Sequence, residues 1–172
     1  TYRDIDVADH VALIAFEPEE ESPIVFLRLN KNFKKRGLKV SAVATKQSIA
    51  MDKLKAEFVK VVPGAESSAV ASLSLTAKSL ILVGERASES AGLFSAVAEL
   101  SAKTGAKIAY IPRRAGERGA LEAGALGSLL PGGRPVSDAA ARVDIAAAWG
   151  VAALPTEPGR TTTEIISALA SN

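Results

Sequence analysis

The chain has 172 residues, with 21 Lys and Arg against 19 Asp and Glu, one His and no Cys. This length fits one compact domain, or one domain with a short appendage. The net charge of +2 argues against nucleic-acid binding, and no apolar run approaches the roughly 20 residues that a membrane-spanning helix needs. We therefore expect a soluble chain that binds no nucleic acid and does not insert directly into a membrane.

The absence of cysteine excludes several kinds of site within this chain. It can form no disulfide and can hold neither an iron–sulfur cluster nor a zinc ion through its own thiolates. Its single histidine, His10, is too few for a histidine-based metal site, and its place at the start of a predicted strand favours a surface or core-edge role over that of a base. We expect no metal site and no catalytic residue.

Short, apolar and β-branched runs predict five strands, at residues 10–16, 38–44, 58–62, 80–84 and 107–111. Apolar spacing predicts helices between them, at residues 23–36, 47–56, 66–78 and 90–104. The first helix follows an acidic loop and begins at Ser22 and Pro23, with Ile24, Phe26 and Leu27 facing the core. Phe94 shares the apolar face of the fourth helix, and Tyr110 is expected in the core.

This alternation of strands and helices predicts an α/β fold, a Rossmann-like doubly wound parallel sheet of about five strands in the order 3-2-1-4-5. In such a sheet, a crevice forms outside the carboxyl ends of the strands where the winding reverses. The loops at residues 16–22 and 84–91 should face each other across that crevice, so any ligand is expected between them.

The remainder of the chain forms a second part. We assign residues 1–112 to the α/β domain and residues 113–172 to a Gly/Arg-rich loop followed by C-terminal helices. One helix is capped by Ser137 or Asp138 and ends near Trp149, and Thr161 with Glu164 forms a capping box for the last helix. Within the loop, the arginines at 113, 114 and 118 are expected to form ion pairs with acidic groups on a neighbouring chain. The alternative is that they bind a carboxylate or a phosphate. The leucines at 126, 129 and 130 would then be interface anchors.

The chemistry of the crevice argues against a phosphate-bearing ligand. A dinucleotide site needs glycines that let backbone N–H groups reach the phosphates, without competing negative charge. The two loops instead carry glutamates, at 17, 19, 20, 21, 85 and 89, with Arg86 as a lone cation. We interpret these glutamates as solvated loop charges that favour the positive ends of helices, and a Mg²⁺ ion between Glu17 and Glu85 is the alternative.

Four strings resemble one protein family, the largest iron–sulfur subunits of bacterial respiratory NADH:quinone oxidoreductase (complex I). They are ADHVALIAFEPEEESPIVFLRLNK (8–31), LILVGERASES (80–90), IPRRAGERGALEAGALGSLLPGGRPV (111–136) and WGVAALPTEPGRTTTEI (149–165). Long irregular strings of this kind rarely recur by chance. The resemblance covers essentially the whole chain.

That family in turn resembles the molybdopterin oxidoreductases, in which a Gly-x-Asn-Pro loop and a Pro-Gly-Thr-Asp turn help to hold a guanine-dinucleotide cofactor. Here the loop reads Ala-Phe-Glu-Pro at 15–18 and the turn reads Pro-Gly-Ala-Glu at 63–66. These changes remove hydrogen-bond donors and add a negative charge. The resemblance therefore implies a vestigial crevice that binds no cofactor, marked by Glu17, Pro18, Glu85, Arg86, Pro63 and Gly64.

The resemblance implies a structural, non-catalytic segment of the molybdopterin-oxidoreductase-like domain, in a complex that passes electrons from NADH to quinone and pumps protons. The iron–sulfur clusters of the parent subunit would lie outside this segment. Its partners would be the rest of that subunit and the other subunits of the peripheral arm, on the cytoplasmic face of the inner membrane. A cofactor-binding molybdopterin-type oxidoreductase domain and a free-standing α/β module for a small ligand stay open as alternatives.

Overall fold

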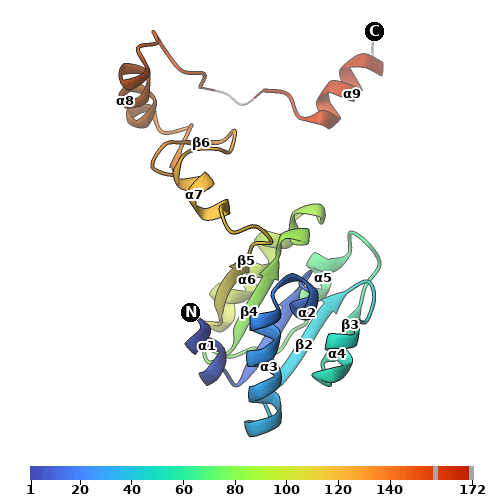
Figure 1. Cartoon of the computed structure of the whole chain (residues 1–172). Coiled ribbons are helices and arrows are strands. Elements are labelled where there is room, and N and C mark those ends of the chain that lie inside the picture. The colour runs from blue at the N-terminus through green and yellow to red at the C-terminus, as the bar shows by residue number, and fades with distance from the viewer. Residues whose placement is uncertain (157–158, 171–172) are drawn as a thin grey trace. The chain divides into compact units, whose positions relative to one another are not determined.

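The computed structural model describes residues 1–156 and 159–170. They fall into two units, Thr1–Arg113 and Arg114–Asn172. The first unit holds one five-stranded sheet, in which every neighbouring pair of strands is parallel. The strand order β3-β2-β1-β4-β5 confirms the predicted fold class and topology (Figure 1). The strands are β1 (His10–Ile14), β2 (Lys39–Ala44), β3 (Glu57–Lys60), β4 (Leu80–Gly84) and β5 (Lys107–Ile111).

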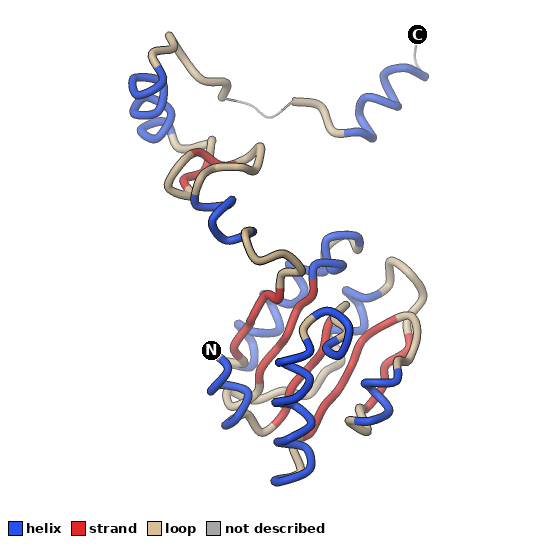
Figure 2. The backbone as a smooth tube through the Cα atoms, in the orientation of Figure 1, coloured by secondary structure: helices blue, strands red, loops and turns tan. Residues whose placement is uncertain are grey.

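Helices cover both faces of this sheet (Figure 2). Alternate strand residues face opposite sides, so Val11 and Leu13 of β1 lie in one apolar cluster while Ala12 and Ile14 lie in the other. The first cluster is completed by helices α1 (Tyr2–Val7), α3 (Pro23–Arg36) and α4 (Ile49–Lys53). The second is completed by α5 (Glu66–Val70) and α6 (Leu93–Thr104). Both faces of the central strands are thereby removed from water.

Helix α3 has its predicted ends, but its buried face is rotated from the predicted one. Gly37 ends the helix with a left-handed φ of +66°. Val25, Phe26 and Leu29 are buried, at spacings that place them on one side of the helix. The prediction that Ile24 and Leu27 face the core was wrong, since they are 47% and 59% exposed.

The acidic loop before α3 contains a helical turn that was not predicted, α2 (Pro18–Glu21). Pro18 occupies its first position, where the missing N–H costs nothing. The run of glutamates obscured this turn because it lacks apolar periodicity.

The helix predicted at residues 66–78 is much shorter, because α5 ends at Val70. Beyond it the backbone hydrogen bonds join residues three apart instead of four. The Ser72 amide donates to the Ala69 carbonyl, and the Leu73 amide donates to the Val70 carbonyl. The Ser72 hydroxyl also donates to the Ala69 carbonyl at 2.7 Å. Serine side chains that bond to the local backbone compete with helix continuation, which explains the early end.

The fourth predicted helix starts later than expected. A 3-10 helix, η1 (Glu85–Glu89), follows β4, and α6 begins at Leu93. Leu93, Val97 and Leu100 are buried as predicted. Phe94 is 46% exposed and Tyr110 is 44% exposed, so the expectation of a core position was wrong for both. The reason is topological, since β5 is an edge strand with no further strand beside it in the described sheet.

The second unit contains short elements and a small core. They are α7 (Glu117–Glu122), the antiparallel pair β6 (Leu129–Leu130) and β7 (Arg134–Pro135), α8 (Ala139–Trp149) and α9 (Thr162–Ala170). Asp138 caps α8 through the amides of Ala140 and Ala141, and the predicted Thr161–Glu164 capping box is present. Among the described residues, no helix combines the length and apolar character needed to cross a membrane.

Leu130 belongs to the core of this second unit. It is 5% exposed and clusters with Ala141 and Ile145 of α8. Its predicted role as an interface anchor was therefore wrong, whereas Leu126 is 51% exposed. The prediction failed because the short β6–β7 hairpin, which folds Leu130 toward α8, leaves no clear periodicity in a glycine-rich stretch.

Candidate functional site

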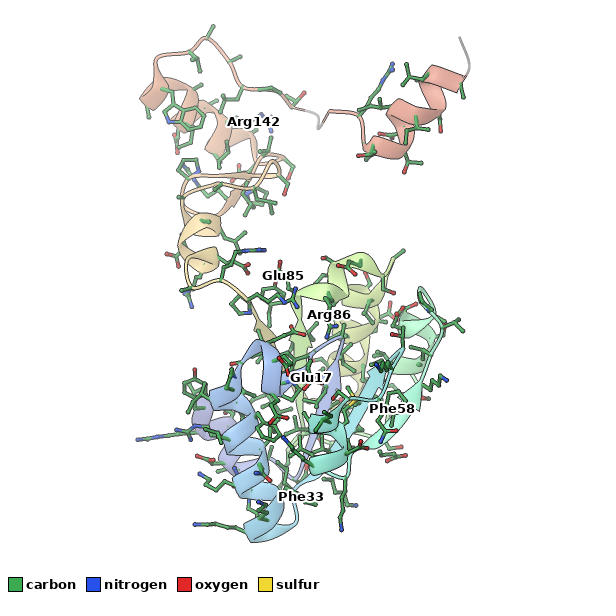
Figure 3. All side chains as sticks on the ribbon, turned by 45° about the vertical axis from the view of Figure 1, so that its right-hand side comes forward. Glu17, Phe33, Phe58, Glu85, Arg86 and Arg142 are labelled. Carbon is green, nitrogen blue, oxygen red and sulfur yellow. The ribbon has the colours of Figure 1, made fainter. Side chains whose placement is uncertain are left out.

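The predicted crevice is present at the carboxyl ends of β1, β2 and β4, with a volume of about 670 Å³. The two loops that follow β1 and β4 both line it. Of the six residues assigned to it from the sequence, four lie in its wall and two, Pro18 and Glu85, do not. The four are Glu17, Pro63, Gly64 and Arg86. Figure 3 shows Glu17 and Arg86 near the same end of the sheet.

Backbone strain and close approach shape the floor of the crevice. Ala15 follows β1 with a φ of +48°, a left-handed conformation that non-glycine residues rarely adopt. This turn ends the strand two residues earlier than predicted and sends the chain into α2. A Cβ at position 84, at the end of β4, would lie under 3.0 Å from the Ala15 carbonyl oxygen. Glycine is therefore required at this contact.

Glu17 uses its carboxylate to begin α2. Its Oε1 accepts a hydrogen bond from the Glu19 amide at 3.3 Å, and the Glu17 amide donates to Oε1 of Glu21 at 3.0 Å. These reciprocal bonds satisfy amides that a helix start leaves without partners. The same amides, at a helix start after β1, are the donors that a bound phosphate would need. Protein carboxylates already occupy them.

The carboxylate of Glu21 is buried and paired. Its side chain is 3% exposed, so the expectation that this residue is a solvated loop charge was wrong. Arg86 Nη2 donates to Oε1 of Glu21 at 2.7 Å, and Arg113 Nε lies 3.6 Å from Oε2. Arg86 is thus the cation that joins the two loops. A guanidinium in this position is already engaged by a carboxylate and is not freely available to an anionic ligand.

The turn before α5 is also closed by a carboxylate. Pro63 and Gly64 occupy its centre, with Gly64 at a φ of +88° and the Ala65 amide bonded to the Val62 carbonyl. Oε2 of Glu66 accepts hydrogen bonds from the Gly64 amide at 2.8 Å and from the Ser90 hydroxyl at 2.7 Å. Glu66 therefore ties this turn to the segment before α6.

Burial by itself would raise the pKa of Glu66, but the hydrogen bonds from Ser90 and the backbone outweigh it and lower the pKa below its usual value. Glu66 was not among the site residues predicted from the sequence. Its position two residues after a Pro-Gly turn was the available signal, because a carboxylate there can accept from the glycine amide.

The remaining charges of the wall are partly neutralised as well. Lys53 of α4 pairs with Glu19 at 2.5 Å. Lys46, Glu20 and Glu89 also line the crevice, so carboxylates outnumber cations in its wall. Among the described residues, no group of three or more His, Asp or Glu side chains is arranged to hold a metal ion.

His10 lies at the opposite end of the sheet, at the start of β1. Its Nε2 is 3.0 Å from the Ser41 hydroxyl. Burial is the main influence on this imidazole and lowers its pKa below the ordinary value of 6.5. Hydrogen bonding with the Ser74 backbone and the charges of Asp9 and Glu57 act in the opposite direction.

The three arginines that were expected to meet a neighbouring chain have partners in this one. Arg113 faces Glu21, Arg114 pairs with Glu117 at 3.1 Å, and Arg118 pairs with Glu122 at 3.0 Å. The last pair is widely exposed, with both side chains more than half accessible.

Comparison with known proteins places the chain among proteins that carry one name, the NADH-quinone oxidoreductase subunit designated G. The chain is 46% identical over 178 residues to the protein of this name from Mycobacterium tuberculosis, and equally similar to that of Mycobacterium bovis. The protein of the same name from Streptomyces coelicolor is 44% identical over 186 residues. No family model matches the chain.

These alignments include 99% of this chain and 22% of each relative. The chain thus spans about a fifth of the length of the curated relatives that it matches. Such identity, sustained over nearly every residue of the chain, confirms the resemblance found in the sequence strings. The chain is a homologue of one segment of the NADH-quinone oxidoreductase subunit designated G.

Proposed function

We propose that this chain is a structural, non-catalytic segment of that subunit, here called the parent subunit, in a proton-pumping NADH:quinone oxidoreductase. The observation that carries this proposal is the 44–46% identity to NADH-quinone oxidoreductase subunits over 99% of the chain. The electron carriers of the parent subunit are proposed to lie outside this segment, since the segment has no cysteine to hold an iron–sulfur cluster. Its contribution is shape, provided by a rigid parallel sheet.

The crevice is proposed to have lost molybdopterin binding. The donor set does not fit an anionic cofactor, because the amides of Glu17, Glu19 and Gly64 donate to carboxylates of this chain. The Arg86 guanidinium is likewise held by the buried Glu21. A phosphate would have to displace these partners and lie beside several glutamates, and repulsion between two such charges about 4 Å apart is roughly 1 kcal/mol even in water.

The proposed partners are the rest of the parent subunit and the other subunits of the peripheral arm, on the cytoplasmic face of the inner membrane. The exposed apolar residues of the first unit support this arrangement, since Leu27, Phe94, Ile108 and Tyr110 are each more than 40% exposed. In a larger protein of which this chain forms about a fifth, neighbouring segments would cover such residues.

The structural role is tested in the assembled complex. The parent subunit carrying a substitution in this segment is produced in cells, and both the amount of complex and its NADH:quinone turnover per complex are measured. Gly84→Ala, which disturbs the fold, should lower the amount of complex and leave turnover per complex within about twofold. Lys46→Ala, a matched crevice variant on an exposed side chain, should change neither. A tenfold loss of turnover per complex with Lys46→Ala would contradict a purely structural role.

Loss of cofactor binding is tested on the isolated chain. Its melting temperature is measured with GDP, GTP or NADH at millimolar concentration. A ligand present at about 100 times its dissociation constant stabilises a protein by about 2.7 kcal/mol, which shifts the melting temperature by several degrees. We expect a shift below about 1 °C. A shift of several degrees with a guanine nucleotide favours the cofactor-binding alternative, for which the size of the crevice is the supporting observation.

A further inference from the structure

Strand β5 forms one edge of the parallel sheet, and its composition is that of an inner strand. Its sequence is Lys-Ile-Ala-Tyr-Ile, with one charge at its first residue. Strands of parallel sheets are normally covered on both faces, and apolar edge strands invite pairing with another strand. Here Ile108 and Tyr110 are each 44% exposed and Phe94 of α6 is 46% exposed. We name these three residues the β5–α6 patch.

The hydrogen-bond register shows which way the backbone of β5 points. The Lys107 amide donates to the Ser79 carbonyl at 3.1 Å, and Lys107 is the register partner of Leu80. Backbone groups alternate in direction along a strand, so the N–H and C=O of Ile108 point away from β4. The described sheet has no strand beyond β5 to receive them.

The side chains of the patch lie on the α6 face of the sheet. Ile108 is the register partner of Ile81 and Tyr110 that of Val83. Ile81 and Val83 are almost completely buried in the cluster that α6 completes. The ring of Phe94 contacts that of Tyr110, with centroids 6.2 Å apart. On this face Ile81 and Val83 of β4 are thus covered, whereas Ile108 and Tyr110 of β5 are half exposed.

The strand at the other edge of the sheet, β3, carries charges that β5 lacks. Strand β3 has the sequence Glu-Phe-Val-Lys, with exposed charges at both ends and a partly buried apolar pair between them. Charged residues on an edge strand discourage pairing with further strands. Edge β3 is therefore protected as a true edge, and β5 is not.

We propose that in the full-length parent subunit β5 is an inner strand. A segment from the part of that subunit outside this chain adds a sixth strand beside Ile108 and places apolar side chains against the β5–α6 patch. This inference rests on the proposed function, because it needs the chain to belong to the larger protein. About four-fifths of the relatives' length lies outside the aligned segment, which covers 22% of it.

Hydrogen exchange tests the added strand directly. Exchange of the Ile108 amide is measured in the isolated chain and in the full-length parent subunit, with residue resolution from electron-transfer fragmentation. We expect exchange of this amide to be about 100-fold slower or more in the full-length protein, because an amide bonded between strands exchanges only when the sheet opens. The Ala109 amide, which points to β4, is the internal control and should be protected in both. Equal rates for Ile108 in the two samples would overturn the proposal.

Two substitutions at one position separate backbone pairing from side-chain packing. Ile108→Pro removes the outward N–H, and proline is tolerated on an edge strand when its N–H faces outward. Ile108→Ser keeps the N–H and removes the apolar side chain. The parent subunit is produced in two pieces, this chain and the remainder, and their association is measured by affinity purification. We expect Ile108→Pro to weaken association at least about tenfold more than Ile108→Ser. Equal association of both variants with wild type contradicts the proposal.

Three further results distinguish the added strand from a second copy of the chain and from failure of the proposed function. Should Ile108→Pro fail to fold, the exchange measurement on the unmodified chain still tests the added strand. A concentration-dependent dimer of the isolated chain that protects the Ile108 amide would assign this edge to a second copy and overturn the proposed occupant. If the parent subunit assembles into an active complex while the Ile108 amide exchanges freely, this inference fails and the proposed function stands. If the chain is absent from such a complex, the proposed function itself fails.

Discussion

The carbonyl oxygen of Ala15 and the α-carbon of Gly84 are so close that any side chain at position 84 would overlap that oxygen. A Cβ there would stand under 3.0 Å from it. This contact joins the ends of β1 and β4, the two strands between which the direction of winding reverses. Ala15 is also part of the wall of the crevice.

Gly84→Ala should therefore lower the free energy of unfolding of the first unit by about 2–3 kcal/mol, because the added methyl group forces the ends of β1 and β4 apart. Chemical denaturation followed by circular dichroism measures the change. The control is Gly127→Ala, where a Cβ meets nothing within 4 Å and φ is not positive. If both variants change stability by less than about 0.5 kcal/mol, the close approach of Ala15 and Gly84 is wrong.

Ala15→Gly should have the opposite effect. A left-handed conformation costs a non-glycine residue roughly 1–2 kcal/mol, whereas the greater freedom of glycine in the unfolded chain costs roughly 0.5–1 kcal/mol. The net expectation is a gain of about 0.5–1 kcal/mol in the free energy of unfolding, read from urea denaturation. Ala12→Gly, in the extended part of β1, should instead lose about 1 kcal/mol. A loss of stability with Ala15→Gly would be incompatible with the φ of +48° at that position.

Because the Glu21 carboxylate is buried beside Arg86, removing Arg86 alone should lower the free energy of unfolding more than removing both charges together. Arg86→Ala leaves the Glu21 carboxylate, 3% exposed, with the Glu17 amide as a hydrogen-bond donor and the more distant Arg113 as a cation. We expect a loss of about 2–3 kcal/mol, somewhat less than for a fully buried pair because Arg86 is itself half exposed.

Combining Arg86→Ala with Glu21→Gln should recover part of that loss, since the double variant no longer buries an unpaired charge. The matched control is Arg118→Ala. Its pair with Glu122 is exposed, so its removal should change stability by less than about 0.5 kcal/mol. Thermal denaturation of wild type, Arg86→Ala, Glu21→Gln and the double variant measures the coupling, with Arg118→Ala measured beside them. Strictly additive effects at 21 and 86 would argue against the ion pair.

His10 predicts a pH dependence of stability near neutrality. Burial lowers its pKa in the folded state below the ordinary value of 6.5. Well above pH 6.5 the imidazole is neutral in both states and the folded state has its full stability. As the pH falls below that value, the unfolded chain binds a proton that the folded chain binds only at lower pH, so the free energy of unfolding decreases.

The melting temperature of the wild-type chain should therefore decrease between about pH 7.5 and pH 5. In His10→Gln, which keeps a polar side chain near Ser41, this decrease should be smaller. A pH dependence of equal size in both proteins would show that His10 is not its source.

The sequence determined the architecture through local patterns. Short apolar runs and helical spacing, with glycine at the ends of α3 and α6, defined five parallel strands and the order in which they pair. Two of the predicted caps, Asp138 and the Thr161–Glu164 box, also follow from a few adjacent residues. These features depend on the chemistry of neighbours along the chain, and such neighbours are visible in a sequence.

Only the tertiary structure decided which charges are buried and which apolar residues are exposed. Glu21 lies in an acidic run that reads as a solvated loop, yet it is buried against Arg86, which is 65 residues further along the chain. Tyr110 was expected in the core and is half exposed because its strand is an edge. The physical reason is that burial and ion pairing depend on distances between segments remote in sequence, and these distances are fixed only when the sheet and its helices pack together.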